Sequence, residues 1–188
     1  MKRTYIDLKS FFNKRHVYPA STEFDILNPY YVEEQFRFGE IESNGVFAYI
    51  DRNAEKLDSM NCLKQTVEIN DLPCDSIVFI GTCCWGYYKE EFKLKFSDGS
   101  TGCAKAVFFD WYWSVEDTIK VAIGLDAEEL SEYNHVFRKQ IKRDDKKDYC
   151  FIYYYKTDFK IKGRKLRQII FPDNMFMNIF AITVYGEE

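Results

Sequence analysis

The feature that most limits the possible folds of this chain is a strict alternation at residues 92–96. Apolar residues there alternate with lysines, which is the pattern of a strand with one buried and one solvent-exposed face. Asp98-Gly99 follows at once, and this dipeptide favours a two-residue hairpin turn. Residues 104–109 are the predicted returning strand. The segment therefore predicts an antiparallel β-hairpin.

Short strands of this kind are predicted along most of the chain, at residues 65–69, 76–81, 148–155, 157–161, 166–171 and 178–184. Asn44-Gly45 is a second turn signal. The best helix candidate is residues 126–130, where Asp126 and Glu129 form a capping box. Many short strands with at most one or two short surface helices predict an all-β antiparallel sandwich. No linker-like segment interrupts the chain, so we expect one domain over residues 1–188.

Composition narrows the function classes. The formal net charge is −4 and the sequence pI is near 5.4, so we expect no nucleic-acid partner, which would call for a basic face. No segment approaches the roughly 18 apolar residues of a membrane span, so we expect no membrane association. The first ten residues lack the apolar region of a signal peptide. The expected location is therefore cytoplasmic for the chain as given, and extracellular if it is a fragment of a larger secreted protein.

The six cysteines form no C-x-x-C pair, and His16 and His135 are the two histidines of the chain. Zinc sites use such residues at short, repeated spacings, so we expect no metal and no cofactor. Most of the cysteines are expected to be reduced and buried. Neither histidine stands in a recognisable nucleophile motif, and we therefore expect no catalytic residues.

Several segments stand in an informative order along the chain: Ile6-Asp7-Leu8, residues 76–86, Ser97-Asp98-Gly99-Ser100, Phe109-Asp110-Trp111 and residues 166–183. In this order they resemble segments of the galactose-binding-like jelly-roll domains appended to bacterial glycoside hydrolases and carbohydrate esterases. This resemblance implies a jelly roll and carbohydrate recognition. The chain departs from the pattern at Cys84-Trp85, where those domains place a small polar residue before a glycine.

Two aromatic segments have the chemistry of a sugar site. Sugars present apolar C–H faces and hydroxyl edges, so their sites combine exposed aromatic rings with carboxylate or amide groups. The first segment offers Trp85, Tyr87, Tyr88 and Glu90 in a glycine-containing loop between predicted strands. The alternative is that Trp85 caps one end of the core. The second segment offers Trp113.

Trp111 and Trp113 share one face if their segment is a strand, because side chains alternate there. We expect Trp111 in the core and Asp110 hydrogen-bonded to a nearby backbone group. For Trp113, a place in the core and a place on the surface are equal alternatives. The sequence thus predicts a non-catalytic carbohydrate-binding-like module, with a glycan as the candidate partner. One alternative is a structural or protein-binding sandwich. Another is a glycan-active enzyme built on two of the 30 carboxylates.

Overall fold

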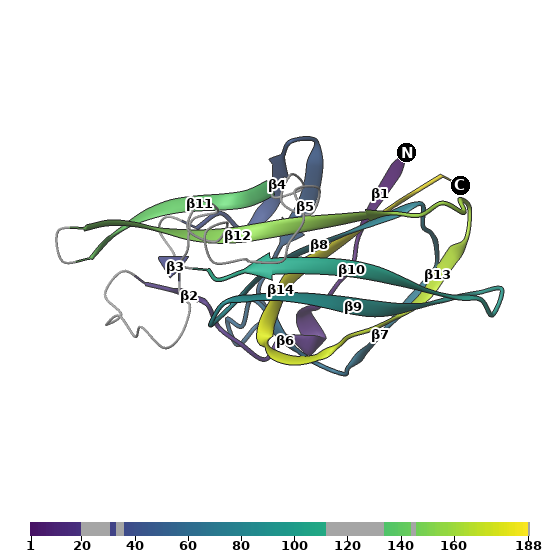
Figure 1. The fold of residues 1–188 in the computed structure, drawn as a ribbon, viewed down its shortest axis with the longest axis horizontal. Helices are drawn as coiled ribbons and strands as arrows, with labels where there is room; N and C mark the ends of the chain where they lie inside the picture. The colour runs from purple at the N-terminus through teal and green to yellow at the C-terminus, as the bar shows by residue number, and fades with distance from the viewer. Residues whose placement is uncertain (20–30, 33–35, 112–133, 144–145, 188) are drawn as a thin grey trace.

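The computed structural model describes residues 1–19, 31–32, 36–111, 134–143 and 146–187, with side chains described outside residues 134–151. Two antiparallel sheets form a sandwich (Figure 1). The larger has six strands in the order β1-β14-β8-β12-β11, with β6 also paired to β14. Its strands are β1 (Lys2–Tyr5), β6 (Met60–Leu63), β8 (Ser76–Cys83), β11 (Asn134–Arg143), β12 (Lys146–Asp158) and β14 (Asp173–Gly186).

The second sheet has four strands in the order β10-β9-β13-β7. They are β7 (Thr66–Pro73), β9 (Tyr87–Phe96), β10 (Thr101–Phe109) and β13 (Lys165–Ile170). Three short additions complete the described structure: the parallel pair β2 (Val17–Tyr18) and β3 (Tyr31–Val32), the hairpin β4 (Gly39–Ser43) with β5 (Val46–Ile50), and the 3-10 turn η1 (Lys9–Phe11). The predicted all-β antiparallel sandwich is confirmed.

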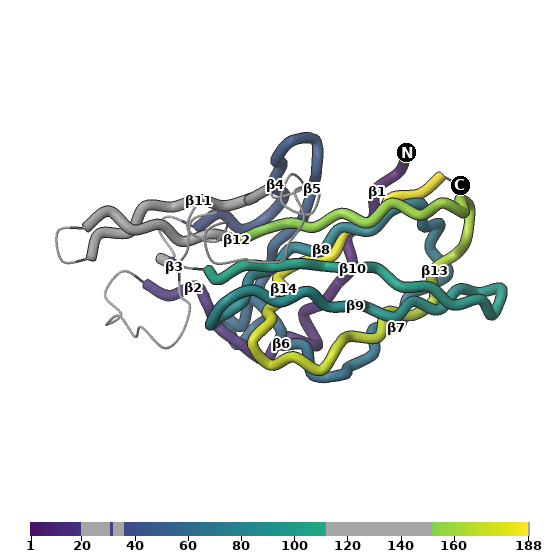
Figure 2. Tube along the Cα trace, in the orientation of Figure 1, coloured from purple at the N-terminus to yellow at the C-terminus, as the bar shows by residue number. Residues whose placement is uncertain are grey.

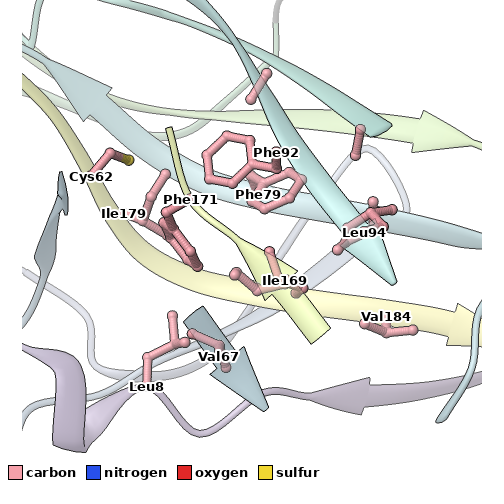
Figure 3. Close-up of a cluster of buried hydrophobic side chains, with 14 of the residues drawn as sticks. Leu8, Cys62, Val67, Phe79, Phe92, Leu94, Ile169, Phe171, Ile179 and Val184 are labelled. Carbon is pink, nitrogen blue, oxygen red and sulfur yellow. The ribbon is translucent and has the colours of Figure 1, made fainter. Parts of the chain in front are cut away.

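The main core lies between the two sheets. Phe79 of β8 stacks on Phe92 of β9, with ring centroids 4.1 Å apart (Figure 3). The same cluster includes Leu94 of β9 and Ile169 of β13, both fully buried. The lysines between Phe92 and Phe96 are exposed, as the alternation predicted.

A second core covers the opposite face of the larger sheet. Val46, Ala48 and Ile50 of the β4–β5 hairpin cluster with Val78 and Ile80 of β8. Every residue of β8 is therefore buried, because its two faces belong to different cores. The uninterrupted apolar run of β8 is typical of a strand covered on both sides.

The β9–β10 hairpin is confirmed, but its turn is longer than predicted. The backbone N–H of Gly99 donates to the carbonyl of Phe96, and that of Phe96 donates to the carbonyl of Ser100. Three residues thus form the loop, with Gly99 at φ +80°, which is a type I turn followed by a left-handed residue. At the other predicted turn, Asn44 and Gly45 both have positive φ, as a two-residue hairpin loop requires.

The other predicted strands are confirmed, with one exception in length. The segment at residues 157–161 contributes only its first two residues, as the end of β12. The predicted helix at 126–130 lies outside the described residues. The cysteines whose side chains are described are all free thiols. Cys62, Cys74 and Cys83 are buried, Cys84 is half-buried and Cys103 is exposed. No described helix is long and apolar enough to cross a membrane.

The two ends of the chain meet in the larger sheet. In the antiparallel register of β1 and β14, Lys2 faces Gly186 and Tyr5 faces Thr183. The marked N- and C-termini consequently lie near each other (Figure 2).

Candidate functional site

The turn between β8 and β9 presents Trp85 to solvent. Trp85 has φ +66° and Gly86 has φ +123°, so two successive residues adopt conformations that favour glycine. Trp85 is nevertheless 64% exposed. It therefore does not cap the core, and the exposed interpretation of this residue is the correct one.

Hydrogen bonds hold this turn on both sides. The backbone N–H of Cys84 donates to the carbonyl of Phe176 on β14 at 3.0 Å. The backbone N–H of Gly86 donates to the carboxylate of Asp110 at 3.2 Å, which confirms the expected bond from Asp110 to nearby backbone. Trp111, 4% exposed, donates its backbone N–H to the carbonyl of Cys83. The predicted burial of Trp111 is thus confirmed.

Tyr88 and Glu90 of β9 contact β14 of the larger sheet at this end of the sandwich. Both share the inward face of β9 with Phe92, because side chains alternate along a strand. The ring of Tyr88 stacks on Phe176 of β14 at 6.0 Å and 12°, and burial raises the pKa of the Tyr88 phenol. The carboxylate of Glu90 accepts a hydrogen bond from the side-chain amide of Asn174 at 2.8 Å.

A bulge in β14 adds two exposed side chains that the sequence did not predict. Asn174 pairs with Cys62 and Asn178 pairs with Asn61, so residues 175–177 have no counterparts on β6. Met175 is 63% exposed and Phe176 is 40% exposed as a result.

Asparagines stabilise the bulge. The Asn61 amide donates to the Met175 carbonyl at 2.6 Å and to the Asn178 side-chain oxygen at 2.9 Å. The Asn174 side-chain oxygen accepts the Phe176 N–H at 3.0 Å. Asn174 and Asn178, which flank the segment, are the only residues in the sequence that indicate a bulge. They do not identify it unless the register of β14 with β6 is known.

We refer to Trp85, Tyr88, Met175 and Phe176 as the aromatic rim. Of the predicted site residues, the structure brings Trp85 and Tyr88 into the rim, and Glu90 lies beside it. Tyr87 is not part of the rim, because its ring packs against Phe109 of β10, with ring centroids 6.0 Å apart. Trp113 lies outside the described residues.

A serine, a histidine and an aspartate also meet in the structure, away from any recognised motif. Nδ1 of His16 lies 2.5 Å from Oγ of Ser59 and 3.6 Å from a carboxylate oxygen of Asp58. One ring nitrogen therefore faces both partners, whereas a catalytic triad uses the two nitrogens for different partners. His16 is 4% exposed, and both partners are fully buried. The three side chains therefore form a buried structural cluster that lacks the geometry of a catalytic triad.

The Asp58 carboxylate accepts the backbone N–H groups of His16 and Val17 at 2.8–3.0 Å. It thereby fixes the segment that leads into β2. Among the residues that the structure describes, no group of three His, Cys, Asp or Glu side chains is placed to hold a metal ion.

Comparison with known protein families gives a match over most of the chain. The model of a family described as an AziU2-like beta-sandwich domain matches residues 11–188, which include the whole aromatic rim. No curated protein matches the chain.

Proposed function

The chain belongs to the AziU2-like beta-sandwich domain family, and from this premise we propose that it is a non-catalytic binding module whose aromatic rim contacts a carbohydrate. The residues proposed to make the contact are Trp85, Tyr88 and Phe176, with Glu90 and Asn174 as polar neighbours. The same ligand class is implied by the resemblance to galactose-binding-like jelly rolls.

The observation that carries the proposal is the conformation of Trp85. A left-handed backbone costs a residue other than glycine roughly 1–2 kcal/mol, and Trp85 in addition leaves most of its ring in water. Neither property benefits the folded state. Strained residues of this kind cluster at ligand sites, where the surrounding structure holds them in place. The bonds from Cys84 and Gly86 provide that restraint here.

The chemistry of the rim suits one face of a sugar. Exposed indole and phenyl rings offer apolar surface to its C–H groups, and Glu90 and Asn174 form a polar border beside them. Glu90 is half-buried and Asn174 is 8% exposed, and their mutual hydrogen bond leaves the second carboxylate oxygen of Glu90 as an acceptor for a sugar hydroxyl. The rim is built on two sheets, and the Tyr88–Phe176 stack joins them.

The test compares Trp85→Ala with Ile161→Ala on a glycan array and in affinity gels. Ile161 is 63% exposed and follows the end of β12, which pairs with the start of β8, so it lies at the opposite end of the sandwich. We expect the native chain and Ile161→Ala to retain the same glycans and Trp85→Ala to lose them. Absence of retention by the native chain, or equal retention by both variants, contradicts the proposal.

A protein partner is the second candidate for the rim. Trp85, Met175 and Phe176 are exposed apolar side chains at one end of the molecule, and such groups also mark protein interfaces. Light scattering after size exclusion separates the two candidates. A stable oligomer of the native chain that Trp85→Ala dissociates, together with no glycan retention, favours the protein partner.

A further inference from the structure

We propose that a cleft between β1 and the end of β5 is a second binding site, which takes a single neutral sugar ring. The cleft has a volume of about 240 Å³. We name it the Tyr5–Tyr49 cleft after its aromatic wall; Leu8 and Phe180 belong to its apolar lining, and Lys9 and Asp51 to its polar lining. It shares the ligand class of the proposed function but none of the residues of the aromatic rim.

The aromatic wall is firmly positioned. The rings of Tyr5 and Tyr49 lie 5.8 Å apart at 35°, and Tyr49 is 45% exposed. Tyr5 ends β1, which is paired with β14, and its phenol donates a hydrogen bond to Glu40. Glu40 in turn stands opposite Tyr49 in the β4–β5 register. The two rings are thus held from separate strands before any ligand arrives.

The polar side of the cleft can both donate and accept. Nζ of Lys9 lies 3.1 Å from a carboxylate oxygen of Asp51, and both side chains are partly exposed. An ammonium group has three hydrogens and a carboxylate about four acceptor positions, so this pair keeps unused capacity. A sugar hydroxyl, which donates and accepts at once, matches an adjacent donor and acceptor better than a simple ion does.

Charge and size restrict the ligand further. Acidic side chains around the cleft outnumber basic ones, by three to two: Asp7, Glu40 and Asp51 against Arg3 and Lys9. This balance disfavours a phosphate or carboxylate ligand. Sites for drug-sized ligands occupy about 300–1,000 Å³, so 240 Å³ suits one ring rather than an oligosaccharide.

The test is a titration of the ¹⁵N-labelled chain with methyl glycosides of glucose, galactose and mannose, followed by amide chemical shifts. We expect at least one glycoside to shift the amides of residues 5–9 and 49–51. Tyr49→Ala is expected to weaken binding by roughly tenfold or more, because aromatic anchors dominate small sites. Tyr49→Phe keeps the ring and is expected to stay within about threefold of the native affinity.

Each other outcome overturns the proposal. These outcomes are no shift at the cleft with any glycoside, equal affinities for Tyr49→Ala and Tyr49→Phe, and shifts caused by tetramethylammonium but not by glycosides. Both variants change a partly exposed side chain, and a thermal melt of each verifies the fold. Trp85→Ala is measured in parallel and is expected to bind the glycosides at the cleft as the native chain does. Shifts at the cleft but not at the rim of the native chain, or at the rim but not at the cleft, show which of the two proposed sites is wrong.

Discussion

Gly81 is a core position at which a single added methyl group should destabilise the fold strongly. It lies in β8, the strand buried on both faces, and its φ is not positive. Space rather than backbone conformation therefore requires glycine here. A Cβ atom would lie 2.5 Å from the backbone oxygen of Asn178 and 2.8 Å from Cε2 of Phe108.

The expected cost of Gly81→Ala follows from which atoms must move. Overpacking a core costs about 1–3 kcal/mol, and the nearest atom here is a backbone oxygen that cannot rotate away. We therefore expect a loss of about 3 kcal/mol in the free energy of unfolding. For a chain of this length each kcal/mol lowers Tm by about 2–4 °C, so Tm should fall by roughly 6–12 °C.

Urea and thermal denaturation followed by circular dichroism measure this effect. Gly102→Ala is the matched control, since its Cβ would meet only side-chain atoms, the nearest being the ring edge of Phe96 at 3.2 Å and Arg164 Nη2 at 3.7 Å, and side chains can shift. We expect that control to remain within about 1 kcal/mol of the native chain. If Gly81→Ala also remains within about 1 kcal/mol, the close approach of β8 and β14 is not the constraint described here.

Three further predictions concern polar groups. Asp58→Ala should lower the free energy of unfolding by about 3 kcal/mol, measured in urea, because it leaves two backbone N–H groups without their acceptor; a loss below about 1 kcal/mol would contradict this. Iodoacetamide should label Cys103 in the folded chain, and should label Cys83 only after unfolding, because burial raises the pKa of that thiol. Peptide mass spectrometry reads this out, and labelling of both at equal rates refutes it. Burial and the bond to Glu40 raise the pKa of Tyr5 from 10.0 to about 12, so its contribution to stability is complete below pH 10 and is lost as pH rises through 12; Tyr5→Phe should remove that part of the alkaline loss in pH-dependent melts.

The sequence was sufficient for the parts of the fold that depend on neighbouring residues. The alternation at 92–96 identified the inward face of β9, and the placement of Trp111 in the core followed from the size of its ring. The predicted two-residue loop at Asp98-Gly99 was one residue too short, because the same dipeptide also fits a three-residue loop.

The parts that were missed depend on partners far along the chain. Met175 and Phe176 lie between the predicted strands at residues 166–171 and 178–184, and only the register between β14 and β6 shows that they form an exposed bulge. Tyr87 and Tyr88 are adjacent in sequence, yet one packs on Phe109 and the other on Phe176. The Tyr5–Tyr49 cleft joins two strands that no local pattern connects.

The position of β14 has a consequence for how the chain is made. It hydrogen-bonds to β1, β6 and β8, and it is the last described strand in chain order. At about 5–20 residues per second of synthesis, roughly 5–20 s separate the appearance of β8 from that of β14. During this interval the larger sheet lacks the strand that joins three of its members. We therefore expect chaperone binding or aggregation to occur mainly during this interval.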